Sequence, residues 1–212
     1  MKDRRRLHLV LDHFRILGSS LLCRFFELFL NTVVLEDLNL SEKLGFNQVW
    51  AAFRQYEDEF PEELTKHIFC SHLNAEGFVD TSKISRFFAQ ELLKARPHWD
   101  VEDFMDAWDR SLVDVIKPEM SHIADLNLKE RHPGSGRMEM TKYFRSDLPS
   151  DPESRFIALF KTRARWQYED LIPFIADFGR DPKELDAVIL KHGRFSTQKD
   201  VRFITPRSQL LE

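Results

Sequence analysis

The sequence has few cysteines and no long uninterrupted apolar run, and each shortage excludes a class of protein. The two cysteines, Cys23 and Cys70, are too few for a disulfide framework and form no Cys-x-x-Cys pair. The most apolar window, residues 21–35, carries Arg24 and Glu27, so it is too polar and too short for a membrane span. These shortages favour an intracellular protein without a membrane segment, a structural disulfide or a zinc finger.

The motifs of the common enzyme classes are missing too. The sequence contains no phosphate-binding loop, no dinucleotide fingerprint, no His-Glu-x-x-His and no nucleophile elbow. His67, Cys70 and His72 lie close together, but their spacing does not place all three on one helical face, so we interpret them as ordinary helix residues. We therefore expect neither an enzyme nor a cofactor or metal site. The basic start of the chain is followed by Asp12 and His13 within its apolar run, so no signal peptide is expected.

Glycine is also scarce, whereas phenylalanine is abundant. The 212 residues contain 7 Gly and 19 Phe, and 42% of the chain is hydrophobic. This composition favours a folded protein of packed helices over a sheet-rich one with many glycine turns. The fold class we expect is mainly α with short β-hairpins.

Helical periodicity and turn residues divide the chain further. A leading helix would span residues 7–17 and end at Gly18, with a turn at Ser19 and Ser20. Apolar stripes predict helices at residues 22–33, although residues 21–25 could begin as a strand, then near residues 46–53 and from Pro61. A short strand is predicted at Phe78 and Val79.

The following segments repeat one order of elements. A helix capped by Asp80 or Thr81 and a second one from Asp100 precede a short helix after Pro118 and a β-hairpin around residues 132–136. After the linker at residues 148–152, the order returns, with helix starts at Asp151-Pro152 and Asp181-Pro182, a helix end at Gly193 and a hairpin around residues 196–200. Helices followed by a two-stranded hairpin are the winged-helix order.

The sequence thus predicts three tandem winged-helix domains, at residues 22–80, 81–147 and 148–212, after a leading helix and turn at residues 1–21. Residues 22–80 fit the order less well than the other two. In the last domain, the stretch of residues 155–175 combines an apolar helical face with a basic cluster. We expect its core to contain these apolar residues: Phe156, Leu159, Phe160, Trp166 and Phe174.

The charge is distributed unevenly. Residues 155–212 hold 11 Lys and Arg against 8 Asp and Glu, a net charge of +3, which leaves −7 for residues 1–154. Basic residues around the third helix and the wing of the last domain are the candidate DNA contacts: Lys191, Arg194, Lys199, Arg202 and Arg207. Secondary candidates are Lys161, Arg163 and Arg165. The alternatives are a solvated basic face or a surface for an acidic protein.

A second candidate surface lies near the N-terminus and is aromatic and acidic. It contains Trp50, Phe53, Glu57, Asp58 and Glu59, which together could contact a basic protein partner. The alternative is that the aromatic residues belong to the core and that the acidic run is a solvated connection.

The chain resembles the Dcc family of sister chromatid cohesion proteins, and the resemblance covers essentially all of it. The C-terminal residues that carry it are Arg155–Phe160, Trp166, Glu169–Asp177, Leu190, Lys191 and Val201–Ser208. Upstream, it is carried by Phe78–Asp80, Lys83, Ile84, Leu92, Leu93, Glu102–Trp108, Tyr143, Phe144, Leu148 and Pro149, with a fainter match at Phe14–Gly18.

This resemblance implies a non-catalytic subunit of an alternative clamp loader, acting in the nucleus in DNA replication and sister chromatid cohesion. The implied partners are the Ctf-type large subunit and the small subunit of that loader, the catalytic subunit of DNA polymerase epsilon, and single- and double-stranded DNA. The sliding clamp PCNA would be loaded or unloaded indirectly. Family members also carry a β-rich N-terminal region, which these residues lack. A winged-helix transcription regulator that binds DNA is the alternative function.

Overall fold

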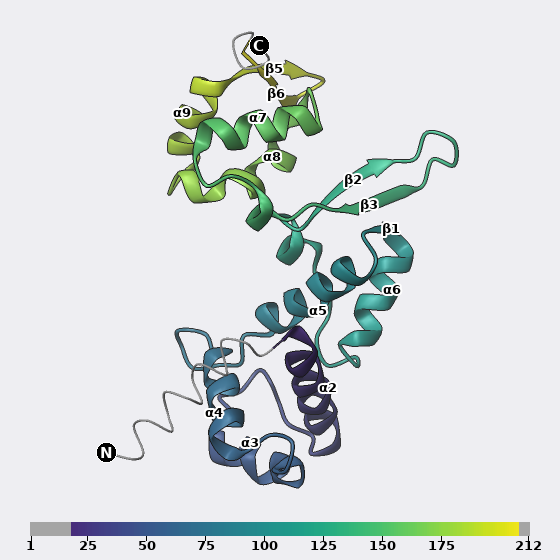
Figure 1. The fold of residues 1–212 in the computed structure, drawn as a ribbon, viewed down its shortest axis with the longest axis vertical. Helices are drawn as coiled ribbons and strands as arrows, with labels where there is room; N and C mark the ends of the chain where they lie inside the picture. Colours follow the sequence, from purple (N-terminus) through teal and green to yellow (C-terminus); the bar gives the residue numbers. More distant parts are fainter. Residues whose placement is uncertain (1–17, 208–212) are drawn as a thin grey trace. The chain divides into compact units, whose positions relative to one another are not determined.

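The structure, a computed structural model, describes residues 18–207 and is drawn in Figure 1. The helix predicted at residues 7–17 lies outside the described range. Contacts group the chain into two compact units, the first with residues up to Pro97 and Val101–His122, the second with His98–Asp100 and the residues from Ile123 onward. The three predicted winged-helix domains were defined by the repeated order of helices and hairpins. The two units are defined by contacts, so they do not test that division, which stays a prediction.

The N-terminal unit is helical. Its elements are α2 (Ser19–Leu35), α3 (Phe46–Phe53), the 3-10 turn η1 (Arg54–Tyr56), α4 (Glu62–Ser71), α5 (Thr81–Ala95) and α6 (Val101–Ser111). The 3-10 turn η2 (Met120–Ile123) follows where the chain passes into the second unit. Asp80 caps α5 as predicted, because its carboxylate accepts a hydrogen bond from the backbone N–H of Lys83 at 3.1 Å.

The first turn of this unit differs from the prediction. Helix α2 begins at Ser19, and Gly18 is its N-cap with a φ of −56°, so neither a left-handed helix end at Gly18 nor a turn at Ser19 and Ser20 is present. Residues 21–25, which could have begun as a strand, are helical as well. The predicted strand at Phe78 and Val79 is reduced to one isolated bridge between Leu73 and Val79.

Phenylalanine rings form the core of the N-terminal unit. Phe25 is 1% exposed, and its ring centroid lies 5.4 Å from that of Phe26, 5.1 Å from Phe53 and 5.4 Å from Phe60. Trp108 of α6 is fully buried and donates a hydrogen bond from Nε1 to the Ser85 carbonyl at 2.8 Å. The expected packing of helices through aromatic side chains is confirmed in this unit.

The C-terminal unit contains two small antiparallel sheets. The first has the strand order β1-β3-β2 and consists of β1 (His98–Asp100), β2 (Asn127–Arg131) and β3 (Met138–Lys142). The 3-10 turn η3 (Arg145–Asp147) leads to α7 (Pro152–Thr162), β4 (Trp166–Gln167), α8 (Tyr168–Ile175), the 3-10 turn η4 (Ala176–Phe178) and α9 (Pro182–His192). Strands β5 (Gly193–Gln198) and β6 (Val201–Pro206) complete the second sheet, of order β4-β6-β5.

Both hairpins occur where the turn residues predicted them. In the first sheet, β3 lies between β1 and its hairpin partner β2. In the second sheet, β6 lies between β4 and its hairpin partner β5. Asp151 and Asp181 cap α7 and α9, as expected from the Asp-Pro pairs. The chain is therefore mainly helical with short antiparallel hairpins, while the assignment of winged-helix domains and their number stays an interpretation.

Gly193 has a second role besides ending α9. Its φ of −135° is extended, so it is not a left-handed helix end. A Cβ atom at this position would lie 2.8 Å from Cγ2 of Ile204 and 3.1 Å from the carbonyl oxygen of Thr205. Glycine is needed here because the backbone approaches the core side of β6 too closely for any side chain.

The predicted core of the last domain is confirmed. Phe156, Leu159 and Trp166 are fully buried, and they belong to one cluster with Phe174 and Ile204. The indole Nε1 of Trp166 donates a hydrogen bond to the Leu159 carbonyl at 3.0 Å. This cluster holds α7, α8 and α9 against β6.

One charged side chain is buried beside this core. The Arg155 side chain is 5% exposed and forms an ion pair with Asp177. Its Nε donates to the carbonyl of Pro149 at 2.6 Å, and its Nη1 donates to the carbonyl of Phe174 at 3.1 Å. The guanidinium also lies 4.2 Å from the ring centroid of Phe178. Arg155 thus joins α7 to the preceding linker and to the end of α8.

Two histidines are held in their neutral form. His72 packs its ring edge-on against Phe26 with centroids 4.7 Å apart, and burial lowers its pKa. His192 stacks on Phe156 at 4.9 Å, and burial again is the main cause of its lowered pKa. Of the charged groups near them, Lys83 further lowers the pKa of His72 and Asp80 raises it, while Lys191 and Arg207 lower and Glu153 raises the pKa of His192.

Replacing Arg155 by methionine is expected to lower the free energy of unfolding by about 2–4 kcal/mol, because two backbone carbonyls and a carboxylate lose a charged donor. Urea denaturation followed by circular dichroism measures the change. The exposed Arg180→Met is the control and should stay within about 0.5 kcal/mol of the wild type. Equal effects of the two substitutions would contradict the role of Arg155.

The free energy of unfolding is expected to fall as the pH decreases from 7 to 5. Both histidines have native pKa values below the ordinary value of 6.5, so the unfolded chain binds protons first and stability is lost below about pH 6.5. His72→Phe and His192→Phe should each flatten this dependence, and the double variant should flatten it most. Urea titrations at a series of pH values test this, and an unchanged slope in both variants would contradict it.

Candidate nucleic-acid interface

The structure brings three of the candidate DNA contacts together at the base of the β5–β6 hairpin. Lys191 lies in the last turn of α9, and Arg194 follows it on β5, opposite Thr205 of β6. Arg207 comes directly after β6, and its backbone N–H donates to the carbonyl of His192 at 3.2 Å. All three side chains belong to exposed residues, and no ion pair occupies them within residues 18–207. We call Lys191, Arg194 and Arg207 the α9 basic cluster.

Lys199 is separated from this cluster. It occupies the hairpin turn with Asp200, and both have positive φ values, 49° and 61°, as a two-residue type I′ turn requires. Lys199 follows Arg194 by five residue steps along the extended chain, which corresponds to roughly 17 Å. Lys199 is exposed, but it belongs to the tip of the wing and not to the cluster at its base.

Arg202 has partners within the fold. It lies on the same face of β6 as the buried Ile204, because side chains alternate along a strand. Its Nη2 lies 3.1 Å from Oδ2 of Asp186, and its guanidinium lies 4.4 Å from the ring centroid of Tyr168 and 4.3 Å from that of Phe195. A phosphate would have to compete with these contacts, so Arg202 is a weaker candidate than the α9 basic cluster.

The secondary candidates also divide into side chains with partners in the fold and one without. The Arg163 side chain is 15% exposed and forms ion pairs with Glu130 at 2.9 Å and with Asp170 at 3.7 Å. Arg165 lies 3.7 Å from the ring centroid of Phe203 and donates to Gln198 at 2.8 Å. Lys161 is exposed, and within the described part of the chain it has no ion pair, ring contact or side-chain hydrogen bond.

The aromatic and acidic surface of the N-terminal unit loses one member. Phe53 is 0% exposed and packs against Phe25 and Phe60, so its ring belongs to the core and is not available to a partner. The sequence left open whether this aromatic pair is exposed or in the core, and Phe53, the last residue of the 8-residue helix α3, lies in the core. Trp50 remains partly exposed and stacks on Phe46 with centroids 6.2 Å apart.

The acidic run itself is exposed. Glu57 forms an i,i+3 ion pair with Arg54 at 3.8 Å, and Glu59 forms one with Arg24 of α2 at 3.4 Å. Asp58 has no ion pair within residues 18–207. Two of the three carboxylates are therefore partly neutralised, and Asp58 with Trp50 offers the more available part of this surface.

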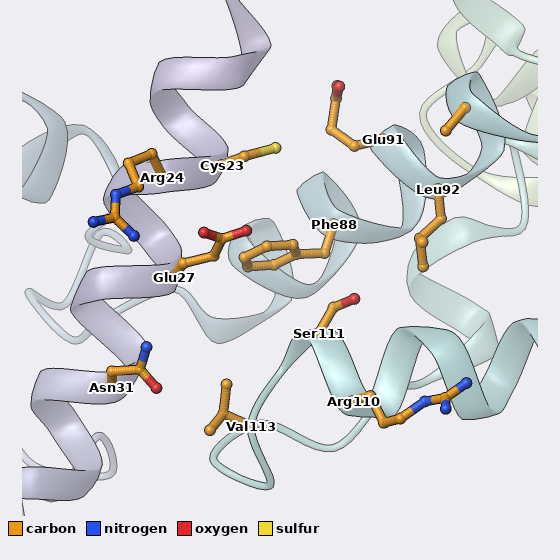
Figure 2. Close-up of a pocket in the computed structure, with 11 residues that line it drawn as sticks. Cys23, Arg24, Glu27, Asn31, Phe88, Glu91, Leu92, Arg110, Ser111 and Val113 are labelled. Atoms are coloured by element: carbon orange, nitrogen blue, oxygen red, sulfur yellow. The ribbon is translucent and has the colours of Figure 1, made fainter.

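A pocket of about 440 Å³ lies in the N-terminal unit between α2, α5 and the end of α6. Figure 2 shows the residues that line it: Cys23, Arg24, Glu27, Asn31, Phe88, Glu91, Leu92, Ala95, Arg110, Ser111 and Val113. Burial, together with the carboxylates of Glu91 and Glu27, raises the pKa of the Cys23 thiol. A raised pKa lowers the fraction of thiolate, the nucleophilic form of cysteine, at neutral pH.

Within residues 18–207, no group of three or more His, Cys, Asp or Glu side chains is placed to hold a metal ion. His72, one member of the His67, Cys70 and His72 group, instead contacts the carbonyl of Ile68 through Nδ1 at 2.8 Å. Nor does any helix in this described range combine the length and apolar character needed to cross a membrane.

A comparison with known families identifies a family for this chain. The family model described as "Sister chromatid cohesion protein Dcc1" matches residues 4–175. The match covers most of the chain and ends before the α9 basic cluster, which is therefore not part of the matched region.

Curated relatives agree with this family. "Sister chromatid cohesion protein DCC1" of Homo sapiens is 27% identical over 156 residues, covering 69% of this chain and 39% of the relative. The Xenopus laevis protein of the same name is 28% identical over 180 residues, covering 80% of this chain and 45% of the relative. "Probable sister chromatid cohesion protein DCC1" of Dictyostelium discoideum is 30% identical over 120 residues, covering 55% and 32%. The chain thus spans less than half the length of these relatives.

Proposed function

The chain belongs to the Dcc1 family of sister chromatid cohesion proteins, and from this premise we propose that it is a non-catalytic accessory module of the Ctf-type alternative clamp loader. In this proposal it acts in sister chromatid cohesion and replication in the nucleus. It links the loader to DNA through its C-terminal unit and to DNA polymerase epsilon through its N-terminal unit, so that PCNA is loaded or unloaded. The family membership and the resemblance set out above support the role in cohesion, and the charge distribution supports the division of labour.

The α9 basic cluster is the observation that favours DNA contact most. Lys191, Arg194 and Arg207 are exposed and have no carboxylate partner within residues 18–207, so phosphate binding would break no existing ion pair. Each cation that neutralises a phosphate releases condensed counterions, which favours binding independently of base sequence. Arg202 and Arg163 do not have this advantage, because both are engaged by carboxylates.

The polymerase contact is assigned to the surface of Trp50, Glu57 and Asp58. An exposed carboxylate run beside a partly exposed indole suits a basic protein surface, since aromatic residues are enriched at such interfaces and the charges steer the encounter. Lys66 lies 5.6 Å from the Phe46 ring centroid, on the aromatic residue that stacks with Trp50. The proposal leaves Phe53 out because it is buried.

Reversing the charge of the α9 basic cluster is expected to weaken DNA binding. Lys191→Glu, Arg194→Glu and Arg207→Glu together should lower the affinity for duplex and single-stranded DNA roughly 10- to 100-fold and reduce the salt slope by about 3. Fluorescence anisotropy between about 50 and 200 mM salt measures both quantities.

The matched control reverses three cations of the N-terminal unit, Lys43, Arg54 and Lys66, which changes the net charge by the same amount. It should leave most of the affinity intact. Similar losses in both triple variants would mean that net charge alone acts, and unchanged binding in the α9 variant would remove the DNA half of the proposal. Strong selection of one duplex sequence from a random pool would favour the transcription regulator instead.

Changing the surface of Trp50, Glu57 and Asp58 is expected to weaken binding to the polymerase epsilon catalytic subunit. Trp50→Ala with Glu57→Lys and Asp58→Lys should lower the affinity at least about tenfold, since truncating an aromatic anchor commonly costs more than 1 kcal/mol. Biolayer interferometry with the full chain measures it. The control Asp103→Lys with Asp106→Lys alters exposed carboxylates of α6 and should bind like the wild type, and equal binding by both variants would contradict this assignment.

A further inference from the structure

The β2–β3 hairpin has two faces of opposite chemistry. Its register places Lys129 opposite Met140, Arg131 opposite Met138, and Glu130 opposite Glu139. Directly opposed residues share a face of the sheet, and the faces alternate along each strand. Lys129 and Arg131 therefore lie on one face and the two glutamates on the other. The alternation of basic and acidic residues along β2 thus gives the hairpin one basic face and one acidic face.

The acidic face has its counter-charge within the C-terminal unit. Glu130 and Glu139 oppose one another directly, an arrangement that repels. Arg163 relieves it, since its Nε donates to Glu130 at 2.9 Å and its Nη2 donates to the carbonyl of Lys129 at 2.8 Å. Leu128, on the same face, is 8% exposed and packs in the core of the C-terminal unit. This face thus attaches the hairpin to the rest of the C-terminal unit.

The basic face is open towards the hairpin turn. Lys129 and Arg131 are exposed, and Met138, which lies opposite Arg131, is 39% exposed. All charged strand residues on this face are basic, because its remaining members are Asn127, Met140, Lys142 and, from β1, Trp99. Arg131 uses one donor, Nη1, on the carbonyl of Gly136 at 2.8 Å, which orients the guanidinium and leaves four N–H donors for other groups.

The shape of the hairpin suits a nucleic-acid groove. Figure 1 shows β2 and β3 as a two-stranded ribbon that extends away from α7, α8 and α9. A two-stranded ribbon fits the major groove of B-form DNA. Residues on one face of a strand repeat about every 7 Å. Lys129 and Arg131 are thus far enough apart for each cation to meet a different phosphate of the DNA backbone.

We propose that the basic face of the β2–β3 hairpin, formed by Lys129 and Arg131, binds the phosphate backbone of duplex DNA. The inference rests on the proposed DNA-binding function and adds a second contact to it. Because the hairpin and the α9 basic cluster belong to the same compact unit, one DNA molecule bound to this unit has two basic surfaces to engage. Arg163 contributes by positioning the hairpin and does not contact the phosphate.

The test uses the full chain and a fluorescent duplex of about 25 base pairs, long enough for two turns of the helix. Lys129→Glu with Arg131→Glu is expected to lower the affinity at least about fivefold and to reduce the salt slope by about 2. Lys43→Glu with Lys66→Glu, which makes the same change in net charge in the N-terminal unit, should have little effect. Thermal unfolding of both variants should match the wild type, because all four side chains belong to exposed residues.

The outcomes separate this inference from the proposed function. If the α9 variant loses affinity and the hairpin variant binds like the wild type, the hairpin contact is overturned and the proposed function stands. If the hairpin variant alone loses affinity and salt slope, the hairpin contact is supported and the α9 basic cluster is not the binding surface. A loss of affinity with an unchanged salt slope would overturn the phosphate contact, and a wild-type chain that does not bind duplex DNA would overturn both.

Discussion

The buried guanidinium of Arg155 is the interaction on which the C-terminal unit depends. It extends from α7 and satisfies carbonyls at Pro149 and Phe174, besides its ion pair with Asp177. A charge this poorly exposed is tolerated when it is paired and hydrogen-bonded, and the partners of Arg155 come from the linker and from the end of α8. Helix α9, capped by Asp181, begins shortly after Asp177 and leads into β5 and β6, which carry part of the α9 basic cluster.

The other arginines of the unit have the same guanidinium group, but their neighbouring residues give them different roles. Arg163 neutralises a carboxylate of the β2–β3 hairpin, and Arg202 joins β6 to α9 through Asp186. Arg194 has no such partner within the described residues. A guanidinium that already has a carboxylate and an aromatic ring gains less from a phosphate, because binding must first break those contacts. Candidate DNA contacts therefore differ from structural cations less in charge than in whether the cationic group already has a partner within the fold.

Local signals in the sequence predicted much of the fold. The Asp-Pro pairs marked the starts of α7 and α9, the turn around residues 132–136 marked the β2–β3 hairpin, and the apolar spacing after Arg155 marked the core with Trp166. Each is a short-range feature, in which one residue caps, turns or buries its own neighbours. The prediction failed at Gly18, because a glycine between two apolar stripes is compatible with a helix end and with a helix start. The sequence predicted which residues belong to the candidate surfaces, but not which of their side chains lie together in the fold.

The sequence by itself determined the helical class, the two hairpins, the core of the last domain and the family resemblance that the comparisons confirm. Tertiary structure decided that Phe53 is buried, that Gly193 must lack a side chain against Ile204, and that the cations at Lys191, Arg194 and Arg207 converge while Lys199 does not. The physical reason is the range of the interactions. Caps, turns and periodicity act over a few residues and can be recognised along the chain, whereas ion pairs, ring stacking and close backbone approach join residues far apart in sequence. Those distant partners decide which charged groups remain free to bind.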